Sequence, residues 1–208
     1  MAFGGEECVM NGPEEELPEV LRDRRLVVLD LEGDGGSPPG IVEIAVLPVD
    51  GPVAAKDVRS WLVNPGRPIG VHARRVHGIT DVQVAGKPLW HGVGPEVLGW
   101  VRDRVVVAHN APVDRKVLAA HLPAWRPTLV LDTLRLARRV WPDLSSHSLE
   151  ALTAHAGIEP EGRAHRAGAD VWSTWRVFLL LVQGLSWERV VELAAVPLPV
   201  EESEVGLW

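Results

Sequence analysis

Two carboxylates, Asp30 and Glu32, close the apolar segment at residues 26–32. Because side chains on a β-strand alternate between faces, both carboxylates point the same way, about 6–7 Å apart along the strand. Like charges this close raise each other's pKa, and a cation between them keeps both ionised. Hard divalent cations prefer carboxylate oxygens, so the pair predicts Mg²⁺ or Mn²⁺. For this pair taken alone, a strand end that simply faces solvent is the alternative.

A second candidate cluster, His-Asn-Ala-Pro-Val-Asp at residues 109–114, stands where a predicted buried strand passes into a helix. In open α/β sheets, ligands bind outside the carboxyl ends of the strands, and a helix N-terminus there attracts phosphate. Asp114 would lie in the first helical turn and face back toward the strand end. The alternative is that Asn110 caps the helix and Asp114 complements the helix dipole.

A third candidate cluster is His-Arg-Ala-Gly-Ala-Asp at residues 165–170. Asp170 falls inside a predicted helix, and its small neighbours would let that helix approach the sheet closely. A buried carboxylate is costly unless it is paired or bound to a metal, so Asp170 is a further candidate ligand. His165 would lie at the mouth of this helix, where a solvated or capping histidine is the alternative.

The elements that position these clusters follow from the apolar pattern. Strands expected at residues 25–32, 41–48 and 58–63 are joined by turns rich in Gly and Pro, which predicts an antiparallel meander. From residue 104, strands alternate with helices, which predicts parallel pairing. The expected fold class is α/β, a mixed five-stranded sheet of three antiparallel and then two parallel strands, flanked by helices. The later strands are expected at 105–108 and 128–131, and the helices at 90–102, 112–121, 132–141, 148–156, 164–183 and 186–195.

The 208 residues fit one domain, expected at residues 23–196 between a mobile N-terminal extension (1–22) and a C-terminal tail (197–208). No apolar run approaches the roughly 20 residues that span a bilayer, so no membrane partner is expected. An acidic N-terminus unlike a signal peptide and a single cysteine favour a cytoplasmic location. The net charge of −7 argues against broad, charge-driven binding to duplex nucleic acid, although a local basic site would remain compatible with it.

The order Asp-x-Glu, Asn-x-x-x-Asp and His-x-Ala-x-x-Asp resembles the DEDDh, or DnaQ-like, family of 3′–5′ exonucleases. That family includes bacterial proofreading subunits, ribonuclease T and oligoribonuclease. The resemblance covers about residues 25–182, and shorter family-like phrases occur in the expected places at 41–45, 76–80, 131–133 and 147–149. It implies a ribonuclease H-like fold. The implied activity is hydrolysis of single-stranded DNA or RNA from a free 3′ end, with release of nucleoside 5′-monophosphates.

The resemblance also implies roles for the clustered residues. Two Mg²⁺ or Mn²⁺ ions about 3.5–4 Å apart would clamp the scissile phosphate. Asp30 would bridge both ions, while Glu32 and Asp170 complete the site that activates water. Asp114 would hold the second ion through water. His165 would be the general base, since a histidine side chain accepts a proton near neutral pH.

Five residues are expected, by the same resemblance, to contact the nucleic acid: Leu31, Gly33, His77, Asn110 and Arg166. Arg166 would contact a phosphate, and a solvated arginine on a surface loop is the alternative. Many family members carry Thr and Gly residues after Asp-x-Glu, and these touch the terminal nucleotide. Here Gly-Asp-Gly-Gly-Ser stands instead at residues 33–37, and Asp34 adds negative charge near the expected phosphate path.

Two other functions compete with the exonuclease hypothesis. One is a catalytically inactive nucleic-acid-binding or scaffold protein that retains the fold, because a fold alone does not prove activity. The other is a related metal-dependent nuclease that cuts internally. The full set of four acids together with His165 favours the exonuclease. The sequence leaves open whether DNA, RNA or short oligonucleotides are the substrate, and whether a polymerase or another protein is a partner.

Overall fold

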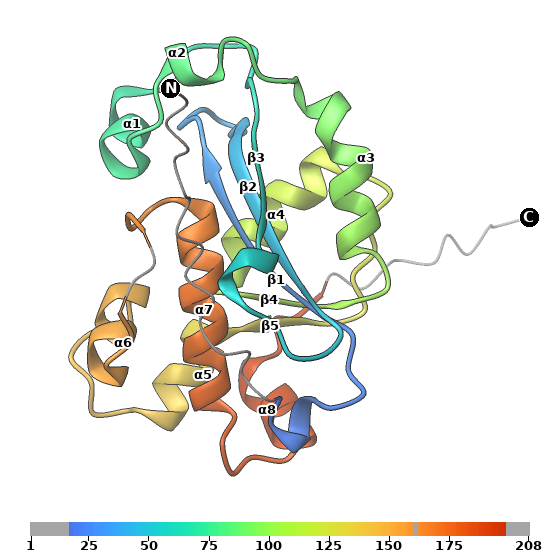
Figure 1. The fold of residues 1–208 in the computed structure, drawn as a ribbon, viewed down its shortest axis with the longest axis vertical. Helices are drawn as coiled ribbons and strands as arrows, with labels where there is room; N and C mark the ends of the chain where they lie inside the picture. Colours follow the sequence, from blue (N-terminus) through green and yellow to red (C-terminus); the bar gives the residue numbers. More distant parts are fainter. Residues whose placement is uncertain (1–16, 160–161, 199–208) are drawn as a thin grey trace, which may run out of the picture.

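A five-stranded sheet forms the centre of the computed structural model, which describes residues 17–159 and 162–198. The strands are β1 (Leu26–Gly33), β2 (Ile41–Val49), β3 (Arg59–Leu62), β4 (Val105–Ala108) and β5 (Val130–Asp132). They lie in the order β3-β2-β1-β4-β5 (Figure 1). The β3–β2 and β2–β1 pairs are antiparallel, whereas the β1–β4 and β4–β5 pairs are parallel. The predicted mixed sheet is therefore confirmed.

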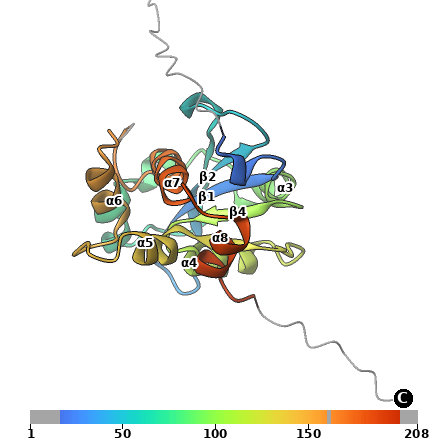
Figure 2. The same ribbon diagram turned by 90° about the horizontal axis from the view of Figure 1, so that it is seen from below.

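Helices cover both faces of this sheet. They are α1 (Val71–His77), α2 (Asp81–Val84), α3 (Trp90–Val101), α4 (Ala111–His121), α5 (Thr133–Val140), α6 (Leu149–Ala156), α7 (Ala167–Leu181) and α8 (Trp187–Ala194), with short 3₁₀ helices η1 (Glu19–Leu21) and η2 (Ala55–Asp57). Helices α5 to α8 share one hydrophobic core with the sheet, and α3 and α4 share the other. Figure 2 shows β1 and β2 between α7 and α3. Among the residues that the structure describes, no helix is both long and apolar enough to cross a membrane.

The alternation of side chains along β1 decides which way its carboxylates face. Leu26 and Val28 belong to the core beneath α7, whereas Val27 and Leu29 belong to the core beneath α3 and α4. Asp30 and Glu32 continue the first series, so the strand directs both toward the side that α7 covers. The alternation therefore places the two acids on the α7 face before the strand ends.

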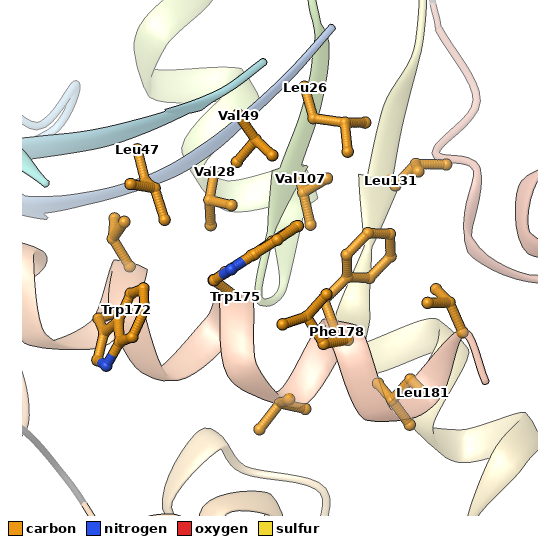
Figure 3. Packing of buried hydrophobic residues seen from close by; sticks show 14 of the residues in the cluster. Leu26, Val28, Leu47, Val49, Val107, Leu131, Trp172, Trp175, Phe178 and Leu181 are labelled. Atoms are coloured by element: carbon orange, nitrogen blue, oxygen red, sulfur yellow. The ribbon is translucent and has the colours of Figure 1, made fainter. Parts of the chain in front are cut away.

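Helix α7 is fixed on the sheet by large buried side chains. Trp175 and Phe178 are almost wholly buried and pack beneath Val28 and Val107 (Figure 3). Burying an aromatic side chain of this size contributes about 2–3 kcal/mol to folding. Because these contacts set the position of the helix, they also set the position of Asp170 in its first turn relative to β1.

The predicted terminal segments lie mostly outside the described residues, which exclude 1–16 and 199–208. The described part of the N-terminal segment includes η1, whose Leu21 is fully buried in the core beneath α7 and α8. At the other end, the Val196 N–H donates to the Val130 carbonyl of β5 at 2.9 Å. The packed part of the chain thus starts before the boundary at residue 22 that the sequence predicted.

Candidate active site

An open cavity of about 850 Å³ lies beyond the carboxyl ends of β1 and β4. The five acidic and imidazole side chains that the sequence singled out all line it: Asp30, Glu32, Asp114, His165 and Asp170. They come from three segments that are far apart in the chain, the end of β1, the first turn of α4 and the beginning of α7. The structure therefore brings the predicted catalytic and metal-binding residues together at one place.

A single buried carboxylate, that of Asp132, organises the wall formed by α4 and α5. Its Oδ1 accepts a hydrogen bond from the Leu134 N–H and another from the Asn110 N–H, both at 2.9 Å. The first bond caps α5, and the second holds Asn110 in a left-handed conformation with φ of 61°. The Asn110 side chain makes no capping bond and lines the cavity, so the alternative in which this side chain caps α4 is wrong. The turn sets the start of α4 and thereby places Asp114, which is 6% exposed.

The beginning of α7 is held by an ion pair between the half-buried Arg166 and the buried Glu43. Glu43 of β2 is 3% exposed and faces Glu32 across the β1–β2 ladder. It accepts hydrogen bonds from Arg166 Nε at 2.9 Å, from Arg166 Nη2 at 2.7 Å and from the Ala167 N–H at 3.0 Å. Three charge-assisted bonds offset the cost of burying this carboxylate, and they fix the point at which the helix begins.

Glu43 was not assigned a role from the sequence. The usable signal is that one carboxylate interrupts the apolar run at residues 41–47, because a charge in a buried strand needs a partner. The same anchor explains why α7 begins at Ala167 rather than at residue 164. His165, directly before the anchored turn, has a φ of 58°, a conformation that is costly for a residue other than glycine.

The acidic residues and His165 meet the requirements of a cation site. Ligand atoms of Glu32, His165 and Asp170 all lie within 4.8 Å of one another. Asp30 Oδ2 is buried and has no hydrogen-bond donor among the described residues. A buried carboxylate oxygen without a donor, next to three further carboxylates, suits a hard divalent cation. The residues present therefore fit a divalent metal ion.

The electrostatics of the cavity agree with this fit. Burial, followed by the charges of Asp114, Asp170 and Glu32, raises the pKa of Asp30 well above its usual value. Burial and then the charge of Asp170 raise the pKa of Glu32 to about 7. Burial is also the main cause that raises the pKa of Asp114 to about 8 and that of Asp170 to about 6. Without a cation, these carboxylates are driven to bind protons instead.

This charge cluster gives a prediction for stability. In metal-free buffer we expect the thermal unfolding midpoint to fall as the pH rises from about 4 to about 8. The folded state keeps protons on Asp170, Glu32 and Asp114 up to pKa values of about 6, 7 and 8, whereas the unfolded chain releases them near pH 4. Stability is therefore lost with rising pH across this window, and Mg²⁺ or Mn²⁺ should raise the midpoint more at pH 8 than at pH 5.

The matched control for this measurement is Asp114→Asn, which removes one of the raised pKa values. Its unfolding midpoint should depend less steeply on pH than that of the unaltered chain. Equal slopes for the two proteins would contradict the prediction. Asp34 and Asp50 do not add to the change in stability between about pH 4 and about pH 8. Their pKa values are lowered, so the stability that they contribute is lost only below about pH 4.

The five residues expected to contact a substrate divide into two groups. Leu31 and Asn110 line the cavity, whereas Gly33, His77 and Arg166 do not. His77 is 1% exposed, its Nε2 donates to the Gly33 carbonyl at 3.2 Å, and its Nδ1 accepts from the Ile79 N–H at 2.9 Å. Both ring nitrogens are therefore occupied by backbone partners. The Arg166 guanidinium is engaged by Glu43, so neither side chain reaches the cavity wall.

The expected negative charge of Asp34 beside the substrate path is corrected by the structure. Asp34 is 1% exposed and forms a salt bridge with Arg67. It also accepts hydrogen bonds from the Gly36 N–H at 2.8 Å and the Gly40 N–H at 2.9 Å. Burial alone would raise the pKa of Asp34, but the Arg67 and backbone hydrogen bonds outweigh it and lower that pKa. The carboxylate thus shapes the turn between β1 and β2 and faces away from solvent.

Comparison with known proteins identifies what this arrangement is similar to. The RNase_T family model, described as an exonuclease, matches residues 27–178. A DNA polymerase III subunit epsilon from Aquifex aeolicus is 32% identical over 173 residues, which cover 79% of this chain and 84% of that protein. A DNA polymerase III subunit epsilon-like protein from Rhodobacter capsulatus is 39% identical over 196 residues, which cover 89% of this chain but only 28% of that longer relative. A solved structure of exonuclease X in complex with 5′ overhanging duplex DNA has a TM-score of 0.62 and 31% identity, and the match covers 81% of this chain and 98% of that one.

Proposed function

Since the chain belongs to this exonuclease family, we propose that it hydrolyses phosphodiester bonds from the 3′ end of DNA or RNA and releases nucleoside 5′-monophosphates. The chain is an exonuclease, and nucleic acid is its substrate class. The observation that carries the proposal is the meeting of four carboxylates and one imidazole in a single cavity. DNA has the more direct support, because the similar solved structure is a complex with DNA.

The cofactors that we propose are two Mg²⁺ or Mn²⁺ ions held by Asp30, Glu32, Asp114 and Asp170. The donor set supports them, since it consists of carboxylates with raised pKa values and includes the unpaired Asp30 Oδ2. When bound, such ions supply Lewis-acid stabilisation of the negative charge on the phosphoryl group. Asp30 lies on the central strand β1, and burial raises its pKa well above the usual value, so we propose that it would be one of the ligands of these ions.

His165 is the proposed general base. Its side chain is 52% exposed, and its ring lies beside the carboxylates of Glu32 and Asp170. The imidazole takes a proton from the attacking water, the water oxygen bonds to phosphorus, and the bond from phosphorus to the preceding 3′ oxygen breaks. That oxygen leaves with the bonding electron pair and takes a proton from bulk water, which makes it the new 3′-hydroxyl. Glu150 Oε1 lies 3.8 Å from His165 Nε2, so a carboxylate faces the imidazole that becomes positively charged.

Leu31 and Asn110 are the substrate contacts that the geometry supports. The Leu31 side chain is half-buried and presents an apolar surface, and the Asn110 amide is free of capping bonds. An apolar wall facing an amide suits the base and sugar of a terminal nucleotide. We assign His77 and Gly33 an indirect role instead of substrate contact, because the hydrogen bond between them holds the backbone that follows Glu32.

The catalytically inactive alternative is not favoured. A protein that only binds nucleic acid has no physical need for four buried or half-buried carboxylates directed at one point, since each of them weakens the attraction for phosphate. Here all four carboxylates and His165 line the same cavity. Such a cluster is costly to maintain without a cation and a reaction to perform.

Digestion of end-labelled strands tests the proposed direction of cleavage. A 5′-labelled single strand with a free 3′-hydroxyl should give a ladder of products shortened from the 3′ end when Mg²⁺ or Mn²⁺ is present. The same strand with a 3′-phosphate should resist digestion, and a circular strand should remain intact. Cleavage of the circle would establish internal cutting and refute the exonuclease direction. Running DNA, RNA and dinucleotides in parallel would identify the preferred substrate.

A further inference from the structure

A second concave surface lies beside the catalytic cavity, between α5 and α8. It encloses about 780 Å³ and is lined by Arg135, Arg138, Arg139, Arg189, Glu192 and Leu193, here called the arginine groove. Four of these six residues are arginines and one is acidic. On a chain with a net charge of −7, this is a marked local concentration of positive charge. Such a concentration attracts a polyanion despite the overall charge.

The arginines of α5 have no partner within the part of the chain that the structure describes. Arg135, Arg138 and Arg139 are exposed and make no hydrogen bond or ion pair to any described residue. Among residues 17–159 and 162–198, the Arg189 side chain of α8 is paired only with Glu192 of its own helix, at 2.6 Å. Three guanidinium groups therefore keep all their donors available for a ligand.

The arginine groove is continuous with the catalytic cavity. Arg138 lines both, and Leu134, one turn earlier on α5, lines the catalytic cavity. The pKa of His109, on the cavity wall, is lowered first by burial and also by the nearby charge of Arg138. Arg135 and Arg139 are four residues apart and therefore share a face of α5, one step round the helix from Arg138. The row of positive charge thus begins at the cavity and leads away from it.

We propose that the arginine groove binds the phosphodiester backbone of the substrate strand, upstream of the nucleotide being removed. This inference rests on the proposed function. Guanidinium groups bind phosphate oxygens in a bidentate fashion, and contacts of this kind hold a strand without reading its sequence. They also offset the repulsion that the acidic cavity exerts on an incoming polyanion. A long strand can therefore occupy both the catalytic cavity and the arginine groove. A dinucleotide bound in the cavity is too short to reach the groove.

The test removes charge from the arginine groove without touching the cavity wall. The variant is Arg135→Gln/Arg139→Gln/Arg189→Gln, which leaves Arg138 in place. We expect kcat/KM for a dinucleotide to change less than twofold, and kcat/KM for a 20-nucleotide single strand to fall about tenfold. The slope of log(kcat/KM) against log(salt) for the long strand should shrink by about 0.7 for each phosphate that the variant no longer binds. An unchanged dinucleotide rate also shows that the variant is folded.

The matched control, Arg22→Gln/Lys56→Gln/Arg102→Gln, makes the same change in net charge at exposed positions outside both cavities. It should leave the long-strand rate and the salt slope near those of the unaltered chain. Equal losses in the two triple variants would show that net charge alone is responsible and would overturn the inference. A faster rate on the long strand in the groove variant would also overturn it, because the arginines would then hinder the strand instead of binding it.

Binding measured without turnover separates this inference from the proposed function. In EDTA, fluorescence anisotropy of a labelled 20-nucleotide strand should show weaker binding to the groove variant than to the control variant. If the full chain fails to shorten any strand but this difference persists, the proposed function fails and the arginine groove stands. If the chain is active and the two variants bind equally, the inference about the groove fails alone.

Discussion

Replacing Asp30 with asparagine should lower the metal-dependent rate of strand shortening by about 10³-fold or more while the protein stays folded. The loss is large because several kcal/mol of charge stabilisation at the phosphoryl group depends on the cations that we propose Asp30 holds. The neutral amide keeps the shape of the side chain but supplies a weaker ligand. Rates on an end-labelled strand, measured with and without Mg²⁺ or Mn²⁺, provide the readout.

Stability of the Asp30→Asn variant is the second part of this prediction. Asp30 Oδ2 is buried without a donor, and neighbouring carboxylates repel it, so removing the charge should raise the metal-free unfolding midpoint at pH 8. Asp143→Asn, at an exposed position outside the cavity, is the control and should keep both its activity and its stability. A collapsed fold in Asp30→Asn would mean that this carboxylate is structural, and a retained rate would remove it from the mechanism.

His165→Ala should reduce the turnover rate by about 10²–10⁴-fold, which is the usual contribution of a general base. Metal affinity, measured by calorimetric titration, should change little by comparison. His91→Ala, an exposed histidine on α3, is the matched control and should behave like the unaltered chain.

The position of His165 also allows a different role, that of a metal ligand, which the same experiment would detect. His165 has a ring nitrogen within 4.8 Å of the ligand atoms of Glu32 and Asp170, which is also compatible with direct coordination of a cation. Were His165 a ligand, the alanine variant would lose metal affinity in step with its rate, and a higher metal concentration would restore turnover. A rate that stays low at saturating metal supports the role of a base.

The sequence predicted that these acidic residues meet in one cavity, because each part of the arrangement follows a local rule. Alternation along β1 places Asp30 and Glu32 on one face, and the passage from β4 into α4 brings Asp114 to the same end of the sheet. Both rules depend only on neighbours in the chain. The mixed sheet was predicted for the same reason, since short turns favour antiparallel neighbours and intervening helices favour parallel ones.

Pairings between distant residues were not predictable in the same way. Arg166 was expected to contact a phosphate, but it binds Glu43, which lies 123 positions away in the chain. Asp34 was expected to lie near the substrate path, but its buried carboxylate is paired with Arg67, 33 positions further along the chain. His77 was expected to contact the substrate, but both of its ring nitrogens form hydrogen bonds with backbone groups. A motif places a residue near a site, whereas only the fold shows which of its polar atoms another segment already uses.

The pairing of Glu43 with Arg166 has a consequence for the electroneutrality of the reaction centre. Glu43 lies directly opposite Glu32, and without its partner it would add a further negative charge to the centre. Arg166 cancels this charge internally, so the four carboxylates that we propose as metal ligands gain no further negative charge from Glu43. The ion pair thereby keeps Glu43 from adding to the repulsion that an incoming phosphodiester meets at this surface.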